Sequence, residues 1–190
     1  MAGLMDTPRP DTTTAAQRGD AGARELLFTT WLPVVLRWCA HLGGAGVDPE
    51  DAAHDVFLVV LRRLDRVYDE AHLPAWLFGV TRRMLAQHRR RAWVRRWVPG
   101  AVPDPPDPAA GPARLAAVSQ TGRAVQALLD AMPPTEREVL VLCLVEERSD
   151  REVSEMLGIP HGTVKSRIRR ARARFLEAAG SAFIDGEETW

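Results

Sequence analysis

Apolar residues recur at helical spacing in two separate stretches of the chain. In the first stretch, a stripe at three- and four-residue intervals predicts a helix over about residues 24–41. A second helix is predicted from Pro49, since Asp48 is a good N-cap and acidic residues suit a first turn. Pro74 is expected to open a third. The apolar positions of these helices are Leu27, Trp31, Val34 and Trp38, then Ala53, Val56, Phe57, Val60, Leu64 and Val67, then Leu77, Val80, Met84 and His88.

The second stretch is also predicted to be helical. Residues 135–138, Thr-Glu-Arg-Glu, have the sequence of a capping box, and so do residues 149–152, Ser-Asp-Arg-Glu. Gly158 is expected to close the short helix that follows the second box, and Pro160 suits the start of another helix at once. Two helices joined by a tight turn with glycine are typical of helix-turn-helix proteins.

Six prolines between Val98 and Ala113 separate the two stretches and indicate a linker with polyproline character. We therefore predict an all-α fold of two small helical domains. The linker residues span roughly 50 Å when extended, at about 3.1–3.4 Å per residue. The predicted division is a disordered N-terminal tail over 1–22, a first domain over 23–97, a linker over 98–113, a second domain over 114–179 and an acidic tail over 180–190.

Composition is that of a soluble globular chain, with 46% hydrophobic and 26% charged residues among 190. No apolar run resembles a signal peptide or a membrane span, so we expect a cytoplasmic protein with no membrane insertion. The 25 basic and 25 acidic residues cancel, which taken alone argues against a protein that coats nucleic acid. The stretches 82–97 and 161–174, however, hold seven and six Lys or Arg and no acid.

The last predicted helix carries one of these cationic stretches. A helical wheel places its apolar residues on one arc, which we expect to pack on the preceding helices. The opposite arc offers small residues, hydroxyls and guanidinium groups, which suit a DNA groove better than a merely solvated surface. The apolar arc holds Val164, Ile168, Ala171 and Phe175; the opposite arc holds Gly162, Thr163, Ser166, Arg169, Arg170 and Ala173; and the flanks hold Lys165, Arg167, Arg172 and Arg174.

The other cationic stretch is interleaved with aromatic residues. Unstacked bases need flat partners and their backbone needs positive charge, so this pattern favours a single-stranded or partly melted nucleic acid. For Trp76 taken alone a place in the core is favoured, whereas nucleic-acid binding is favoured for the cluster as a whole. No P-loop, zinc motif or nucleophile constellation is present, and we expect no enzyme activity, metal or cofactor.

These segments resemble the extracytoplasmic-function sigma factors of bacterial RNA polymerase. Residues 128–140, LLDAMPPTEREVL, and 157–172, LGIPHGTVKSRIRRAR, look like the family's region 4. Residues 49–58, PEDAAHDVFL, resemble its polymerase-binding region 2, and residues 75–83, AWLFGVTRR, look like the segment that opens promoter DNA.

The resemblance implies a promoter-specificity subunit that binds core polymerase, through the clamp helices of the largest subunit and the flap, and reads two promoter elements. It also implies an anti-sigma partner that covers both domains. By position, the minus-thirty-five contacts would be Thr163, Lys165, Ser166, Arg167, Arg169 and Arg170; the minus-ten contacts Trp76, Arg82, Arg83 and Arg90; and the polymerase contacts Asp51, Asp55 and Phe57.

Three positions depart from the family pattern. His54 stands where the family usually has Gln, Arg83 where it commonly has Asn, and Gln87 where it often has Asp. These departures predict an unusual polymerase affinity or minus-ten preference. The rival hypothesis is a stand-alone helix-turn-helix regulator that binds duplex DNA as a homodimer, which leaves the first domain without a role.

Overall fold

The structure is a computed structural model, and it describes residues 12–67, 70–97 and 120–184. The part of the chain that it describes is helical, as the sequence predicts, and contains no strand. None of its helices is long and apolar enough to cross a bilayer. The predicted linker over 98–113 lies outside the described residues.

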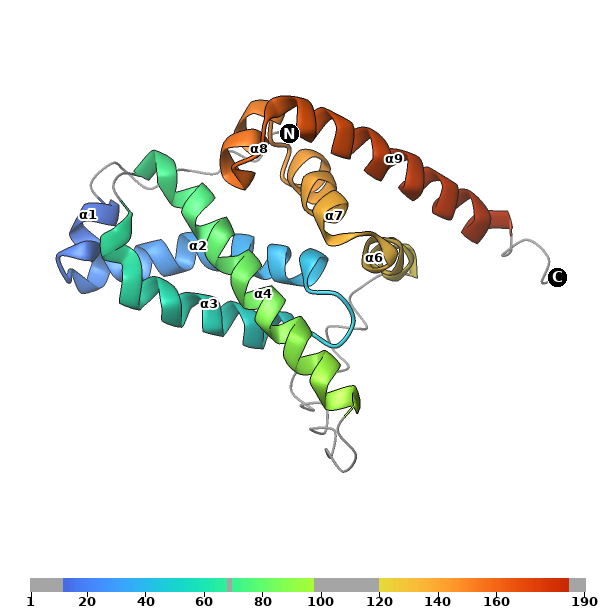
Figure 1. The fold of residues 1–190 in the computed structure, drawn as a ribbon. Coiled ribbons are helices and arrows are strands. Elements are labelled where there is room, and N and C mark those ends of the chain that lie inside the picture. The colour runs from blue at the N-terminus through green and yellow to red at the C-terminus, as the bar shows by residue number, and fades with distance from the viewer. Residues whose placement is uncertain (1–11, 68–69, 98–119, 185–190) are drawn as a thin grey trace.

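The first block is built from three long helices with a short one at its start. These are α1 (Thr12–Gln17), α2 (Ala21–Leu42), α3 (Pro49–Arg63) and α4 (Leu73–Trp97), with 3-10 turns at Leu64–Arg66 and Glu70–His72. Asp48 accepts hydrogen bonds from the backbone nitrogens of Glu50 and Asp51, which confirms the predicted start of α3. The three long helices pack on one another, with α4 crossing the other two (Figure 1).

The predicted stripes of α2 and α3 are buried, and α4 adds a broader face than we expected. Phe78, Thr81 and Leu85 of α4 are buried beside the predicted Leu77 and Val80. The ring of Phe78 meets Trp38 of α2 edge-on, at 5.0 Å between centroids. This packing fixes α4 along the block and leaves its cationic side chains on the remaining surface.

The prediction of a disordered tail over residues 1–22 is wrong where the structure describes it. Residues 12–17 form α1, and Ala16 is buried against the block. The side-chain amide of Gln17 donates to the carbonyl oxygens of Leu64 and Val67, at 2.9 and 2.6 Å. Sequence patterning missed α1 because so short a helix is ordered by these tertiary contacts and not by its own propensity.

The second block consists of α6 (Gln120–Ala131), α7 (Pro134–Leu140), a π-helical turn at Val141–Val145, α8 (Asp150–Leu157) and α9 (His161–Ile184). The capping box predicted over residues 135–138 does not form: α7 begins after Pro133 and has no side-chain cap. The double proline sets the start of the helix instead. The acidic tail predicted over 180–190 is also corrected, since α9 continues to Ile184.

The helix-turn-helix pair α8 and α9 is confirmed. The Ser149 and Glu152 capping box is formed in both directions, and Gly158 closes α8 at φ 64°. Val164 and Ala171 of α9 are buried and Phe175 is partly buried, as the wheel predicts. Buried apolar residues of the two blocks form one connected cluster, so the second block lies against α2 and α4 (Figure 1).

Candidate nucleic-acid interface

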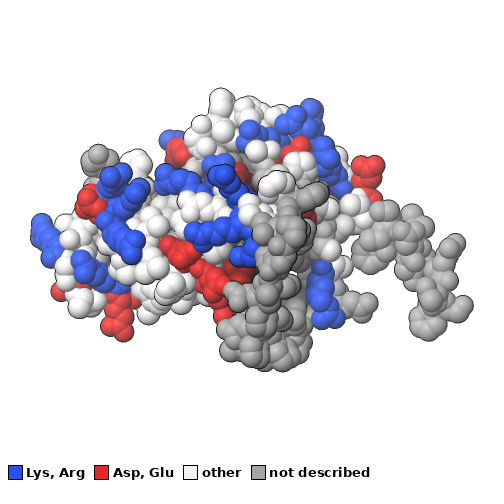
Figure 2. All heavy atoms as spheres, turned by 60° about the horizontal axis from the view of Figure 1, so that its bottom comes forward, with Lys and Arg blue, Asp and Glu red and all other residues white. Residues whose placement is uncertain are grey.

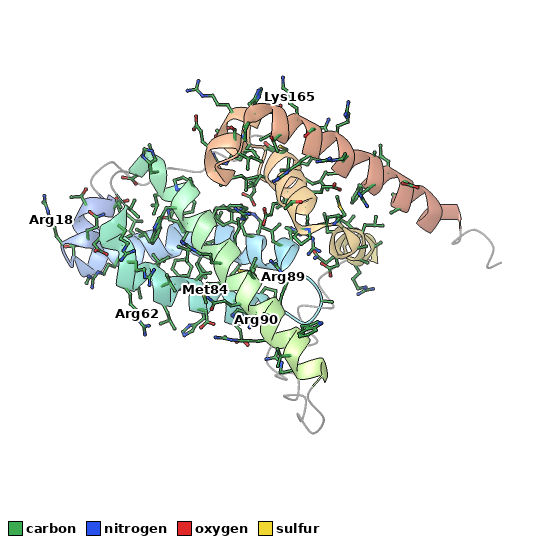
Figure 3. The ribbon with its side chains drawn as sticks, in the orientation of Figure 1. Arg18, Arg62, Met84, Arg89, Arg90 and Lys165 are labelled. Carbon is green, nitrogen blue, oxygen red and sulfur yellow. The ribbon has the colours of Figure 1, made fainter. Side chains whose placement is uncertain are left out.

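The first half of α9 presents an outward surface that includes uncompensated positive charges. Lys165 and Arg169 are exposed, and neither has an ion-pair partner among the described residues. Lys165 points away from α7 and from the first block (Figure 3). Thr163, Ser166 and Arg167 are half-buried, and the Ser166 hydroxyl donates to the carbonyl oxygen of Thr163 at 3.0 Å. This surface is the one that a groove-binding helix needs: free cations beside small polar residues.

Arg170, which we predicted as a base contact, is turned toward its own block. Its Nε lies 3.6 Å from one carboxylate oxygen of Glu136 on α7, and the Nε of Arg174 lies 2.9 Å from the other. Glu136 is buried, so the two arginines neutralise a carboxylate that has little access to water. Both guanidinium groups remain more than half exposed and keep donors for a second partner.

The cationic side chains of α4 divide into two rows along the helix. Trp76, Arg83 and Arg90 follow one another at seven-residue steps and therefore share one line on the surface. Arg82 and Arg89 form a second line, turned toward the second block. Trp76 is half-buried and packs against the core cluster, so its face is only partly available.

A hollow runs between these rows and the second block. Its volume is about 530 Å³. Its lining includes a tryptophan, three arginines and two small residues of α4. The lining residues are Trp76, Gly79, Arg82, Arg83, Ala86, Arg89 and Glu138. Arg89 was missed as a site residue although it lies seven positions after Arg82 (Figure 3 shows Arg89 and Arg90 on α4).

The predicted polymerase contacts on α3 have three different environments. Asp51 is exposed. Asp55 is bound to α4: its carboxylate lies 2.9 Å from Nε2 of His88 and 3.7 Å from Arg91. Phe57 is 4% exposed, and its ring centroid lies 4.7 Å from that of Phe28 with the rings tilted, so it supports α3 from inside and offers almost no surface to a partner. The expected direct contact by Phe57 is therefore corrected.

Lysine and arginine side chains form separate groups on the molecular surface. Figure 2 shows these groups with acidic side chains between them. A chain with zero net charge thus keeps local cationic surfaces, because many of its exposed acids lie between these groups and not within them.

The fold and these surfaces define a helix-turn-helix protein with a second, basic helical block. Residues 27–95 match the family described as sigma-70 region 2, and residues 122–175 match sigma-70 region 4. The chain is 32% identical over 162 residues to the ECF RNA polymerase sigma factor SigM of Mycobacterium tuberculosis, covering 85% of this chain and 80% of that one. This protein belongs to the ECF RNA polymerase sigma factor family.

Other relatives extend the comparison. The ECF RNA polymerase sigma factor SigE of Mycolicibacterium smegmatis is 35% identical over 143 residues, which are 73% of this chain and 54% of SigE. The chain thus spans about half the length of that relative. The fold resembles CnrH in complex with the cytosolic domain of CnrY, with TM-score 0.63, 24% identity and 93% and 97% of the two chains covered. It also resembles sigma factor RpoE of Bartonella quintana in complex with anti-sigma factor NepR, with TM-score 0.62, 21% identity and 82% and 96% coverage.

Proposed function

We propose that this protein is a promoter-specificity subunit of bacterial RNA polymerase. The observation that carries the proposal is that one chain holds both sigma-70 regions, each with a cationic surface on its described part. Two weak DNA-binding blocks on one chain gain effective concentration when both promoter elements are present. The protein performs no covalent chemistry in this role, and the polymerase supplies the catalysis.

The second block would read the minus-thirty-five element through the outward face of α9. Lys165 and Arg169 are the side chains best placed to contact DNA, with Thr163, Ser166 and Arg167 beside them. Arg170 would contribute through the donors that Glu136 leaves free. A helix that lies in the major groove contacts base edges with residues of its first turns and phosphates from its flanks.

The first block would bind the minus-ten element along α4. Arg83 and Arg90 are exposed and would follow the DNA backbone, while Trp76 at the edge of the hollow offers a flat surface to an unstacked base. Arg83 replaces the Asn that the family commonly has, which adds charge to this row. Gln87, on the same helix, is exposed and neutral where the family often has Asp.

Core polymerase would dock on the exposed face of α3. Asp51 and the accessible part of Asp55 supply negative charge there, and His54 is exposed between them. Leu58 and Leu61 continue the same face with exposed apolar surface, which suits a protein partner. For the second block we propose contact with the polymerase flap.

An anti-sigma factor is the second proposed protein partner. It is supported by the resemblance to RpoE and CnrH, whose structures contain NepR and the cytosolic domain of CnrY. Such a partner would cover the cationic surfaces of both blocks while the protein is held inactive in the cytoplasm.

Run-off transcription tests the proposed function. Core polymerase with this protein is expected to start at specific genomic promoters that core polymerase alone ignores, and sequencing the transcript ends identifies those promoters. If no such start appears, while the protein alone binds a palindromic duplex tightly as a dimer, the regulator hypothesis replaces the sigma factor.

A further inference from the structure

Polar contacts between described residues connect the two blocks directly at three places. Arg37 of α2 forms two hydrogen bonds to the Glu146 carboxylate, at 3.2 and 3.0 Å. His41 of α2 lies 3.1 Å from the amide oxygen of Gln126 on α6. Arg82 of α4 donates through Nε to one carboxylate oxygen of Glu138 on α7, at 2.8 Å. Of these contacts, only the last involves a residue that the sequence predicts to contact the minus-ten element, Arg82.

Glu138 is the acidic group of the second block that faces this surface. It is 8% exposed, and its second carboxylate oxygen is buried with no hydrogen-bond partner in the described part of the protein. Burial lowers the pKa of Arg89, while the negative charge of Glu138 raises it and Arg82 lowers it. Glu138 is therefore bound directly to Arg82, while Arg89 beside it donates a hydrogen bond to the carbonyl oxygen of Leu42 at 2.9 Å and is influenced by the charge of Glu138.

The position of Glu138 is one that a nucleic-acid phosphate would occupy. A phosphate that tracks along α4 binds guanidinium groups as a carboxylate does, through charge-assisted hydrogen bonds. Glu138 also lines the hollow that contains Trp76 and Arg83. On its other side, a cavity of about 10 Å³ lies between Leu42, Arg89 and Pro134, which leaves the blocks closely packed. While the blocks are in this arrangement, the guanidinium Nε of Arg82 is already occupied by Glu138 and is not free for a DNA phosphate.

We propose that Glu138 closes the protein on itself by holding Arg82, beside Arg89, in place of promoter DNA. The second block thereby inhibits the first until DNA and polymerase separate them. The inference rests on the proposed function for its biological meaning, but its physical content is a competition between one carboxylate and DNA phosphates for the same arginines. Arg83 and Arg90, in the other row, stay accessible for a first encounter.

The competition predicts the effect of removing one charge. The apparent affinity for DNA is lowered by the fraction of molecules whose arginines are masked, so opening the contact raises that affinity. Glu138→Gln keeps the shape of the side chain and removes its charge. We expect the full-length variant to bind a fluorescein-labelled single-stranded oligonucleotide of mixed sequence roughly 3–10-fold more tightly than the wild type.

Two matched controls separate masking from net charge. Glu25→Gln removes an exposed carboxylate of α2, and we expect less than a two-fold change in the anisotropy titration. In a chain that carries Arg82→Ala and Arg89→Ala, Glu138→Gln is expected to gain less than two-fold, because the masked groups are gone. Circular dichroism melting verifies that each variant is folded. Glu138→Asp, whose shorter side chain withdraws from Arg82, serves as a second opening variant.

The outcomes are decisive. A gain for Glu138→Gln that disappears without Arg82 and Arg89 supports the closed contact. An equal gain for Glu25→Gln, a gain that persists in the arginine-free chain, or no gain in either opening variant overturns it. Run-off transcription separates this result from the proposed function: a wild-type chain that initiates at promoters, with no gain from Glu138→Gln, retains the function and loses the inference.

Discussion

At the scale of single residues, the exposed cationic side chains of α9 differ in whether they form an ion pair. The cause is one buried acid on another helix. Arg170 and Arg174 reach the buried Glu136, whereas Arg169 and Lys165 have no such partner among the described residues. The helical wheel placed all four on exposed arcs, correctly. It could not identify the ion pairs, because Glu136 lies in α7 and approaches α9 only through tertiary packing.

Lys165→Ala tests the outward surface. We expect weaker binding to duplex DNA of any sequence, with the slope of log affinity against log salt reduced by about 1, since one phosphate contact is lost. Fluorescence anisotropy over a salt series measures this slope. Arg151→Ala is the control, because Arg151 is highly exposed on α8 and pairs with Glu155. The same slope change in both variants would show that the salt dependence of DNA binding follows the net charge of the protein and not the position of Lys165.

Arg174→Ala tests the inward pair. The buried Glu136 would lose its closest cation. We expect the free energy of unfolding to fall by about 1 kcal/mol, and the loss is moderate because Arg174 is exposed to solvent. Arg169→Ala, a neighbour without an ion pair, should change it by less than about 0.5 kcal/mol. Urea denaturation compares the two. Equal losses of unfolding free energy in the two variants would mean that the ion pair between Arg174 and Glu136 does not stabilise the fold.

At the scale of elements, the turn between α8 and α9 was predictable because its chemistry is local. Gly158 adopts a left-handed conformation, and Ser149 with Glu152 forms a complete capping box. The similar sequence at residues 135–138 failed, because Pro133 and Pro134 already determine where α7 begins. Helix α1 was not predictable, since Gln17 is fixed by carbonyl groups some fifty positions later in the chain.

Replacing Gly158 by alanine should destabilise the helix-turn-helix. No neighbouring atom lies within 4 Å of the added Cβ, so the cost of about 1–2 kcal/mol is that of the left-handed backbone alone. Gly162→Ala is the matched control: it also has open space, lies in the first turn of α9 and should be neutral or slightly stabilising. Thermal unfolding of the full chain distinguishes them. A neutral Gly158→Ala would contradict this account of the turn.

The capping box should give a pH-dependent contribution. Hydrogen bonds from the Ser149 hydroxyl and backbone lower the pKa of Glu152 below its ordinary value. A lowered folded-state pKa stabilises the protein above the unfolded pKa of about 4.3 and loses this effect as pH falls through the folded pKa. Ser149→Ala should therefore cost about 1 kcal/mol at pH 7 and less in acid.

The measurement is urea denaturation at several pH values from 7 down to about 3, so that the series passes below the lowered pKa of Glu152. Thr135→Ala is the control, because Thr135 is exposed at the start of α7, where no side chain caps the helix. It is expected to have little effect at any pH. A constant loss for Ser149→Ala across the series would exclude the Glu152 contribution.

At the scale of the whole molecule, the sequence predicted two helical blocks but not how they pack. Each block has its own pattern of apolar residues at helical spacing, and each pattern involves only residues that are close together in the sequence. The contacts between blocks pair residues that are far apart in sequence, such as Arg37 with Glu146, and nothing in either pattern marks them as partners. The single connected cluster of buried apolar residues is for the same reason a property only of the folded chain.

A charge exchange across the blocks tests this packing. Arg37→Glu places two carboxylates together, one of them on the almost fully buried Glu146, and should enlarge the radius of gyration measured by small-angle X-ray scattering. The double variant Arg37→Glu, Glu146→Arg should restore the compact value, with a coupling energy of about 1 kcal/mol or more. An unchanged radius in the single variant would show that this ion pair does not hold the blocks together.

Lys165 is the only lysine in the sequence, and its side chain lies on the outer face of α9. Any reagent or enzyme that acylates lysine side chains therefore meets a single lysine side-chain amine on this protein, in the middle of the proposed groove-binding surface. One acetyl group there would remove a positive charge that the many arginines, which resist acylation, cannot lose in the same way. A fluorophore attached by the same chemistry would be placed where DNA is expected to bind, without a single substitution in the chain.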